Sequence, residues 1–350
     1  MAAADVKESV DDDQRRLCEE FAAVTGTDTS LAEYYLREKN WQIEEALNVY
    51  FDGGDPTPQI DLDSHSMSPS GSSGNSSPDL VVTYDSGAPA DSNLGNQTCS
   101  LMLKLLTWNI DGLDNKNITE RTKTVCSIIK RESPDVVYLQ EVIVETFAYI
   151  ETMCSPTYIA IPANSEQYFT TILLRKSRIS LLAHKIIEFP TTKMYRNLLT
   201  VKARFRDIDL LLMTSHMESM KNHSHERKTQ LTTVLKHMSE ADAATAVIFG
   251  GDTNLRDYEI TQIGGLPDSI GDVWQMCGSP EDAQFSWDIT KNDNLDMPFK
   301  PKCRFDRLFL RQGCSSKLLP QMFMFVGTER LPCGRFASDH WGILCEFKIV

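Results

Sequence analysis

Residues 101–350 alternate short apolar runs with helical patterns, and this alternation restricts the fold more than any other feature of the chain. Apolar runs bounded by turn residues are typical of buried strands, whereas apolar residues at every third or fourth position predict helices. Strands are expected at 101–108, 136–139, 158–161, 170–174, 198–203, 210–214, 246–249, 308–310 and 341–347, and helices at 118–130 and 226–238. Many strands with interspersed helices predict an α/β protein with two mixed sheets packed face to face and helices outside.

The first hundred residues are organised differently. Residues 1–13 are polar and predict a disordered start. Residues 14–53 predict a compact bundle of three helices, because three apolar periods follow one another there and Ser30 and Glu33 form a capping box at the second. Residues 54–100 are rich in Ser, Pro, Asp, Gly and Asn without a sustained apolar period, which predicts a disordered acidic linker.

The net charge of −14 lies entirely in the first hundred residues. They contain 5 Lys and Arg against 19 Asp and Glu, whereas residues 101–350 contain 30 of each. The acidic part repels polyanions, but the neutral remainder can bind a short nucleic-acid segment through local basic groups.

The chain shows no signs of export or membrane insertion. Its nine cysteines are scattered and form no CxxC pair, which favours a reducing compartment over a disulfide framework or a zinc site. No apolar run resembles a signal peptide or is long enough to cross a bilayer. We therefore expect a soluble intracellular protein without a membrane partner.

Six polar clusters lie at the ends of the expected strands, at 107–112, 139–142, 214–219, 251–254, 305–307 and 338–342. Asp252 and Asn254 follow the apolar run 246–249 and two glycines, and their spacing points both side chains the same way on an extended chain. A carboxylate and an amide at the mouth of a sheet can hold a water and a divalent cation against a phosphate. Each cluster alone can also be a turn or an ion pair, but six in order predict one site.

The N-terminal bundle resembles the ubiquitin-associated (UBA-like) domain over residues 14–53. The resemblance rests on Phe21, the Thr25-Gly26 turn, Ala32, Leu36 and the run 41–47. It implies ubiquitin binding through the turn after the first helix and the end of the third. Residues 24–26 depart from the Met-Gly-Phe/Tyr often seen in that turn, and the alternative is a capping or dimerisation bundle.

The six clusters resemble the endonuclease/exonuclease/phosphatase superfamily over residues 103–350. The resemblance implies a four-layer α/β sandwich and a Mg²⁺-dependent phosphodiesterase, with Mn²⁺ as a possible substitute. Within that superfamily, the motifs at 107–114, 251–257 and 333–342 resemble the branch that hydrolyses 5′-phosphotyrosyl bonds between DNA and a protein tyrosine, such as trapped topoisomerase II. This implies DNA 5′ ends as substrates, a 5′-phosphate product for double-strand break repair, and a nuclear location with a cytoplasmic pool.

The resemblance also implies roles for the polar residues of the clusters. Glu141 would hold Mg²⁺, which favours oxygen ligands, and Asp111 and Asp339 would assist through water. Asp252 would position or deprotonate the attacking water. Asn109 and Asn254 would orient Asp252. His340, supported by its partner Asp306, would donate a hydrogen bond to a non-bridging phosphate oxygen. His216 would be a second hydrogen-bond donor to the phosphate.

A single-stranded DNA end needs stacking surfaces more than a broad basic patch. The candidates for stacking are Tyr168, Trp287 and Phe305, each of which could instead belong to the core. Ser219 and Arg256 are candidate phosphate contacts. Lys221 occupies a position where the resemblance leads us to expect arginine. Lysine keeps the positive charge but lacks the guanidinium group, which can donate two parallel hydrogen bonds to a phosphate.

The linker offers weaker motifs. The apolar clusters at 60–63 and 80–82 could add as strands to a ubiquitin-like modifier, and Ser68 and Ser77 precede prolines as proline-directed kinase sites do. We expect cleavage of a naked oligonucleotide not to depend on residues 1–100.

Three other functions remain open from the sequence. An abasic-site endonuclease would typically have Gly-Asp-Leu-Asn-Val and Ser-Asp-His-Cys-Pro segments, where this chain has Thr253 and Trp341-Gly342. A lipid or inositol-phosphate phosphatase usually carries membrane-targeting segments. A non-catalytic ubiquitin adaptor would not need the complete set of Asn, Glu, Asp and His residues.

Overall fold

The computed structural model describes residues 2–25, 27, 29–52, 101–164, 168–297, 300–314 and 317–350. The expected linker at 54–100, with its modifier and phosphorylation motifs, lies outside the described residues.

Three helices form the N-terminal bundle: α1 (Ala2–Thr25), α2 (Thr29–Glu38) and α3 (Ile43–Asp52). They pack around a core that includes Phe21, Leu36 and Leu47, all of them fully or almost fully buried. The helix α1 begins at Ala2, so the expectation of a disordered start at 1–13 differs from the structure. The segment contains neither glycine nor proline, the two residues least favourable in a helix, and a polar composition does not prevent a helix.

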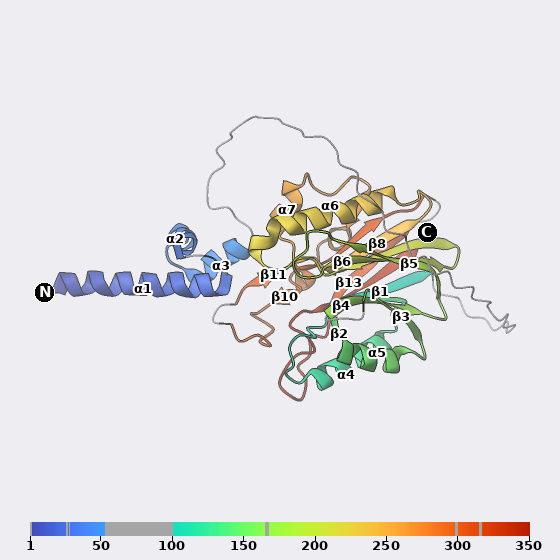
Figure 1. Ribbon diagram of the computed structural model, residues 1–350, viewed down its shortest axis with the longest axis horizontal. Coiled ribbons are helices and arrows are strands. Elements are labelled where there is room, and N and C mark those ends of the chain that lie inside the picture. Colours follow the sequence, from blue (N-terminus) through green and yellow to red (C-terminus); the bar gives the residue numbers. More distant parts are fainter. Residues whose placement is uncertain are drawn as a thin grey trace.

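Two six-stranded mixed sheets form the centre of the part of the molecule that follows residue 100 (Figure 1). The first has the order β13-β14-β1-β2-β4-β3 and the second β5-β6-β7-β8-β12-β9. The strands of the first sheet are β1 (Met102–Asn109), β2 (Val136–Ile143), β3 (Tyr158–Pro162), β4 (Tyr168–Arg175), β13 (Leu318–Val326) and β14 (Gly342–Ile349). Those of the second are β5 (Ile179–Glu188), β6 (Asn197–Phe205), β7 (Ile208–Ser215), β8 (Ala246–Asp252), β9 (Ile270–Asp272) and β12 (Asp306–Arg311).

The sheets pack face to face and helices cover their outer faces, which confirms the expected four-layer sandwich (Figure 1). One core between the sheets joins residues such as Leu105 of β1 to Ile248 of β8, and the Tyr138 hydroxyl donates across it to the Ile248 carbonyl at 3.0 Å. A second core packs α4 (Ile118–Glu132) and α5 (Val144–Cys154) on the first sheet. A third packs α6 (Ser224–Glu240) and residues of α7 (Asp257–Gln262) on the second sheet.

Parallel pairing places the polar clusters at one end of the sandwich. The strand β1 pairs in parallel with β2, so their carboxyl ends bring Asn109 and Glu141 together. The strands β7 and β8 are also parallel, so Ser215 and Asp252 end at the same edge. The antiparallel strand β12 pairs Asp306 directly with Asp252. This register explains why clusters far apart in sequence meet.

Several elements are absent from the sequence-based prediction. The helix α5 follows β2 directly, without a turn signal between them. The strands β5 and β13 lie at sheet edges and mix exposed with partly buried and buried residues, so they lack the continuous apolar run used to identify strands. Shorter elements complete the fold: η1 (Lys221–His223), α8 (Val273–Met276), η2 (Glu281–Ala283), and a ribbon of β10 (Trp287–Asp288) and β11 (Lys302–Cys303).

Two further observations concern the described residues. None of the eight cysteines in the described part forms a disulfide bond. Among the helices of the described ranges, none has the length and hydropathy needed to span a membrane.

Gly250 of β8 packs against Leu308 of the neighbouring strand β12 and Tyr138 of the facing sheet. A methyl group there would lie 2.4 Å from Leu308 Cδ2 and 3.2 Å from Tyr138 Cδ2. We expect Gly250→Ala to lower the free energy of unfolding by about 1–3 kcal/mol, because the packed side chains must shift. Urea denaturation measures this loss, and Ser127→Ala on the exposed face of α4 is the control. Equal stability of Gly250→Ala and the unmodified protein would contradict this packing.

Candidate active site

Asp252 lies at the end of β8 and at the centre of the site. Its Oδ2 accepts a hydrogen bond from Asn109 Nδ2 at 2.9 Å, and the Nε2 atoms of His216 and His340 lie 3.3 and 3.8 Å from the same oxygen. Its Oδ1 accepts a hydrogen bond from the backbone N of Asn254 at 3.0 Å. The carboxylate is almost completely buried, so each of these contacts acts with little screening by water.

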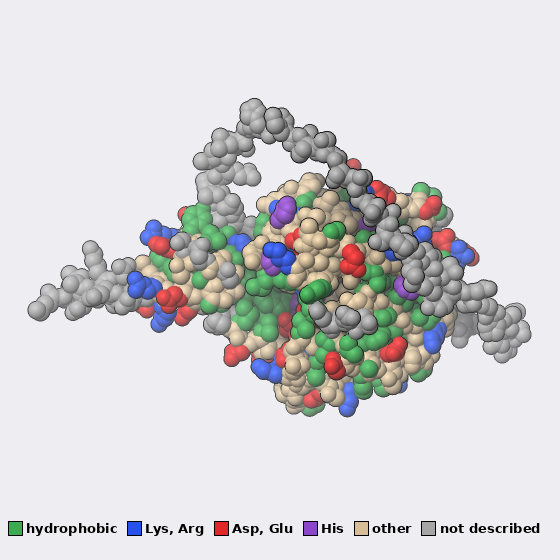
Figure 2. Space-filling view, in the orientation of Figure 1, with side chains coloured by type: hydrophobic (Ala, Val, Ile, Leu, Met, Phe, Trp, Pro, Cys, Tyr) green, Lys and Arg blue, Asp and Glu red, His purple; other side chains and the backbone are tan. Residues whose placement is uncertain are grey.

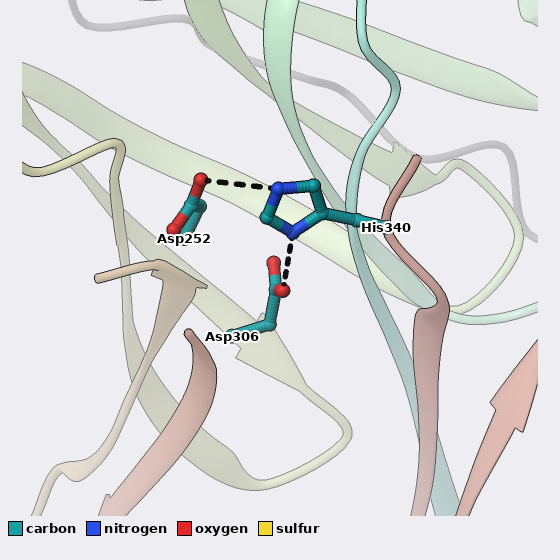
Figure 3. Close-up of side chains that lie close together, drawn as sticks. All are labelled: Asp252, Asp306 and His340. Carbon is teal, nitrogen blue, oxygen red and sulfur yellow. Dashed lines mark hydrogen bonds and ion pairs between the residues drawn. The ribbon is translucent and has the colours of Figure 1, made fainter. Parts of the chain in front are cut away.

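His340 lies between two aspartates (Figure 3). Its Nδ1 is 2.7 Å from Asp306 Oδ2, and its Nε2 faces Asp252. Although burial alone would lower its pKa, the carboxylates of Asp306, Asp339 and Asp252 raise the pKa of His340 well above its usual value. A charged imidazolium is therefore held ready to donate a proton or a hydrogen bond to an anion.

The same charges act on Asp252. Burial alone would raise the pKa of this carboxyl, but the His216 and His340 rings and the Asn109 amide hold it well below its usual value. A carboxylate of low basicity accepts a proton poorly in the ground state. It is better suited to orient a water molecule than to remove its proton completely.

Glu141, Asp111 and Asp339 form a second acidic group beside Asp252. Glu141 Oε1 accepts a hydrogen bond from Asn109 Nδ2 at 3.2 Å, and its side chain is 18% exposed. Asp111 pairs with Arg121 at 2.9 Å. Burial and the nearby carboxylates of Asp339 and Glu141 together raise the pKa of Asp111 to about 8, against the lowering effect of Arg121.

A divalent cation would relieve the repulsion between the carboxylates of that acidic group. The carboxylate oxygens of the group are the hard ligands that Mg²⁺ prefers. Asp252, Asp306 and His340 also have potential ligand atoms within 4.8 Å of one another. Their atoms, however, are engaged with each other, and a charged imidazolium is not a metal ligand (Figure 3). Glu141, with Asp111 and Asp339 nearby, therefore fits a metal ion better than this triad.

Arg196 is a site residue that the sequence prediction missed. Its Nη1 lies 2.9 Å from His216 Nδ1, its Nη2 donates to Ser219 Oγ at 3.1 Å, and its guanidinium lies over the Tyr168 ring at 4.8 Å. Ser219 Oγ also accepts from Asn254 Nδ2 at 3.3 Å. The arginine stands alone before β6, with no motif around it, so no sequence signal marks it.

The predicted aromatic residues lie on two sides of the site. Trp287 and Phe305 pack against each other with ring centroids 5.5 Å apart, and the Phe305 ring is 6.4 Å from His340. Trp287 Nε1 donates to Asp339 Oδ2 at 3.2 Å. On the other side the Tyr168 ring lies 6.3 Å from His216. Both rings of the first pair are less than a tenth exposed.

Arg256 and Lys221 are the remaining predicted phosphate contacts. Arg256 is buried with its guanidinium 5.2 Å from the centre of the Phe305 ring, and its Nη1 donates to the Asn254 carbonyl at 2.8 Å. Lys221 lies farther out and contacts the N-terminal bundle, with its Nζ donating to Tyr35 at 2.8 Å. Both line a pocket of about 340 Å³ that also contains Glu141, Asp252 and His340.

Comparison with known proteins identifies the class of this fold and site. Residues 106–340 match the model of the endonuclease/exonuclease/phosphatase family, and residues 15–56 match that of the UBA-like domain. The structure of a Bacteroides thetaiotaomicron protein of that family aligns with a TM-score of 0.56 at 14% identity, over 71% of this chain and 97% of that one. At that identity the likeness shows the fold alone.

Proteins with higher sequence identity show to which branch of that family the chain belongs. The chain is 42% identical to tyrosyl-DNA phosphodiesterase 2 of Xenopus laevis, over 97% of this chain and 95% of that protein. It is also 42% identical to tyrosyl-DNA phosphodiesterase 2 of Homo sapiens, over 96% and 93%. The crystal structure of the Danio rerio enzyme with a single-strand DNA product aligns with a TM-score of 0.69 at 44% identity, over 70% of this chain and 98% of that one. The chain therefore belongs to the endonuclease/exonuclease/phosphatase family and, within it, to the tyrosyl-DNA phosphodiesterase 2 family.

Proposed function

We propose that this protein hydrolyses the 5′-phosphotyrosyl bond between DNA and a protein tyrosine, and leaves a 5′-phosphate on the DNA. The observation that carries the proposal is the arrangement of an ionised Asp252 between His216 and His340. Water held by Asp252 would attack the phosphorus, and the two imidazoles would bind the non-bridging oxygens around it. In-line attack then breaks the bond to the tyrosyl oxygen opposite the water, and that oxygen leaves with the tyrosine.

The electrostatics of these residues suit a phosphodiester. Its transition state carries negative charge on the non-bridging oxygens, and the positive charge of His340 is held in place by Asp306. Arg196 orients His216 through Nδ1, so the Nε2 of that ring faces the reacting centre. Asn109 bridges Asp252 and Glu141 and keeps the two carboxylates in fixed positions.

A divalent metal ion belongs to this family's chemistry, and we propose Mg²⁺ for this chain, with Mn²⁺ as a substitute. Glu141 would hold it, with Asp111 and Asp339 nearby. When bound, the ion would neutralise charge on the phosphate and the leaving oxygen. The side chains of the protein would carry out the other steps: Asp252 would orient the water, and the imidazoles of His216 and His340 would bind the phosphate.

The proposal is tested with a 5′-phosphotyrosyl oligonucleotide in Mg²⁺, followed by mass spectrometry of both products. We expect free tyrosine and a DNA 5′-phosphate. Chelation with EDTA should abolish release, and Mg²⁺ or Mn²⁺ should restore it. A 5′-hydroxyl product, or turnover that survives EDTA, would contradict the proposed chemistry.

The partners follow from the same proposal. DNA ends blocked by topoisomerase II remnants are the proposed substrates, so we propose that the protein acts in the nucleus. We also propose a cytoplasmic pool. Residues 14–53 are proposed to bind ubiquitin, and the segment 54–100 a ubiquitin-like modifier. The full-length similarity to tyrosyl-DNA phosphodiesterases does not favour the alternative of an abasic-site endonuclease.

A further inference from the structure

The N-terminal bundle forms part of the wall of the active-site pocket. Val24 and Thr25 at the end of α1 and Phe51 in α3 line the same pocket as His216 and His340. In Figure 1 the end of α3 lies against the sandwich near β11, and Figure 2 shows the bundle in contact with the main body. A domain expected to be separate from the catalytic part thus borders the catalytic residues.

Phe51 covers the aromatic surface beside the site. Its ring centroid lies 6.4 Å from that of Trp287, and it packs against the apolar cluster of Trp287, Phe305 and Cys303. A DNA base that stacked on Trp287 would need this same surface. Phe51 therefore occupies a position that suits a stacked base.

Lys221 is engaged by the bundle as well. Its Nζ donates to the Tyr35 hydroxyl at 2.8 Å and lies 3.2 Å from the centre of the Tyr50 ring. An ammonium group that contacts an aromatic ring and donates a hydrogen bond to a hydroxyl is less available to bind a phosphate. One stacking surface and one cation at the pocket are thus both engaged by residues of the bundle.

We propose that the three-helix bundle is an intramolecular cap on the DNA-binding cleft, and that Phe51 imitates the base it excludes. The inference rests on the proposed function, which supplies the substrate. A single-stranded DNA end must displace the bundle to bind. The 48 residues between Asp52 and Leu101 are enough chain for the bundle to detach without unfolding. This differs from the expectation that the N-terminal hundred residues do not affect cleavage.

The cap predicts a particular kinetic signature. Only the open fraction of the protein binds DNA, so the apparent KM is raised by the inverse of that fraction. Chemistry takes place after the cap has left, so kcat does not change. The variant that tests this is Phe51→Ala in the full chain, with Phe51→Trp to restore an aromatic ring and Glu45→Ala on the exposed face of α3 as the matched control.

Steady-state cleavage of the phosphotyrosyl oligonucleotide should show KM lowered roughly fivefold in Phe51→Ala with kcat unchanged. Phe51→Trp and Glu45→Ala should keep the KM of the unmodified protein. A Phe51→Ala variant with unchanged or higher KM would overturn the cap.

Hydrogen exchange tests the same inference without turnover, and without a variant that could disturb the bundle. A single-stranded 5′-phosphorylated oligonucleotide is added at saturation to the full chain. Amides in α3 should exchange faster with the oligonucleotide bound, because Phe51 leaves Trp287. Unchanged exchange in α3 would refute the cap even if tyrosine release is confirmed, and faster exchange would support it even if no tyrosine is released.

Discussion

Asp252→Asn should lower kcat on a 5′-phosphotyrosyl oligonucleotide by about 10²–10⁴-fold, the usual contribution of a positioned acid–base group. The amide keeps the shape of the carboxylate but has a single oxygen, so it cannot accept both the Asn109 and the Asn254 hydrogen bonds that the two carboxylate oxygens accept. It also loses the negative charge that His216 and His340 face. Single-turnover cleavage measures the loss directly.

Asp293→Asn is the matched control, because this exposed aspartate pairs with Arg330 away from the pocket. It should keep full activity. If Asp252→Asn cleaved as fast as this control, Asp252 would not orient the nucleophile.

Glu141→Gln should lower activity at low Mg²⁺ by about a hundredfold or more, since an uncharged amide is a far weaker ligand for a hard cation. Part of the activity should return as the Mg²⁺ concentration is raised, which distinguishes a metal ligand from a general base. A Mg²⁺ titration of the initial rate is the measurement.

Glu132→Gln on α4 is the corresponding control, because Glu132 pairs with Lys104 on the outer face of the sandwich. Its Mg²⁺ dependence should match that of the unmodified protein. Identical Mg²⁺ curves for Glu141→Gln and Glu132→Gln would exclude Glu141 as the ligand.

The sequence predicted the sandwich because its central strands are buried on both faces. Segments such as 246–249 are continuous apolar runs, whereas the edge strand β5 consists mainly of exposed and partly buried residues and was missed. Asn109 and Glu141 lie at the carboxyl ends of the parallel strands β1 and β2 of one sheet, and Asp252 lies at the carboxyl end of β8 in the other sheet. A local pattern carries that information because polar residues directly after a buried run must lie at the sheet edge.

Other parts of the site depend on tertiary contacts that no local pattern encodes. Arg196 joins Tyr168, His216 and Ser219 only because β4, β6 and β7 are brought together by the fold. The contact of Lys221 with Tyr35 joins residues 186 positions apart. The acidic character of the N-terminal part suggested repulsion from DNA, but the bundle residues that line the pocket, Val24, Thr25 and Phe51, are uncharged.

The charges visible on one face of the molecule agree with a local mode of DNA binding. Lys and Arg are interspersed with Asp and Glu among the described side chains of that face (Figure 2). Affinity for DNA would then come from a few groups at the pocket rather than from bulk attraction, and with few phosphate contacts the salt dependence should have a shallow slope.

The central claim is tested most directly by comparing two substrates under identical conditions in Mg²⁺: a single-stranded 5′-phosphotyrosyl oligonucleotide and a duplex with one abasic site. We expect rapid release of tyrosine from the first and little cleavage of the second. Cleavage of the abasic duplex without release of tyrosine would contradict the account.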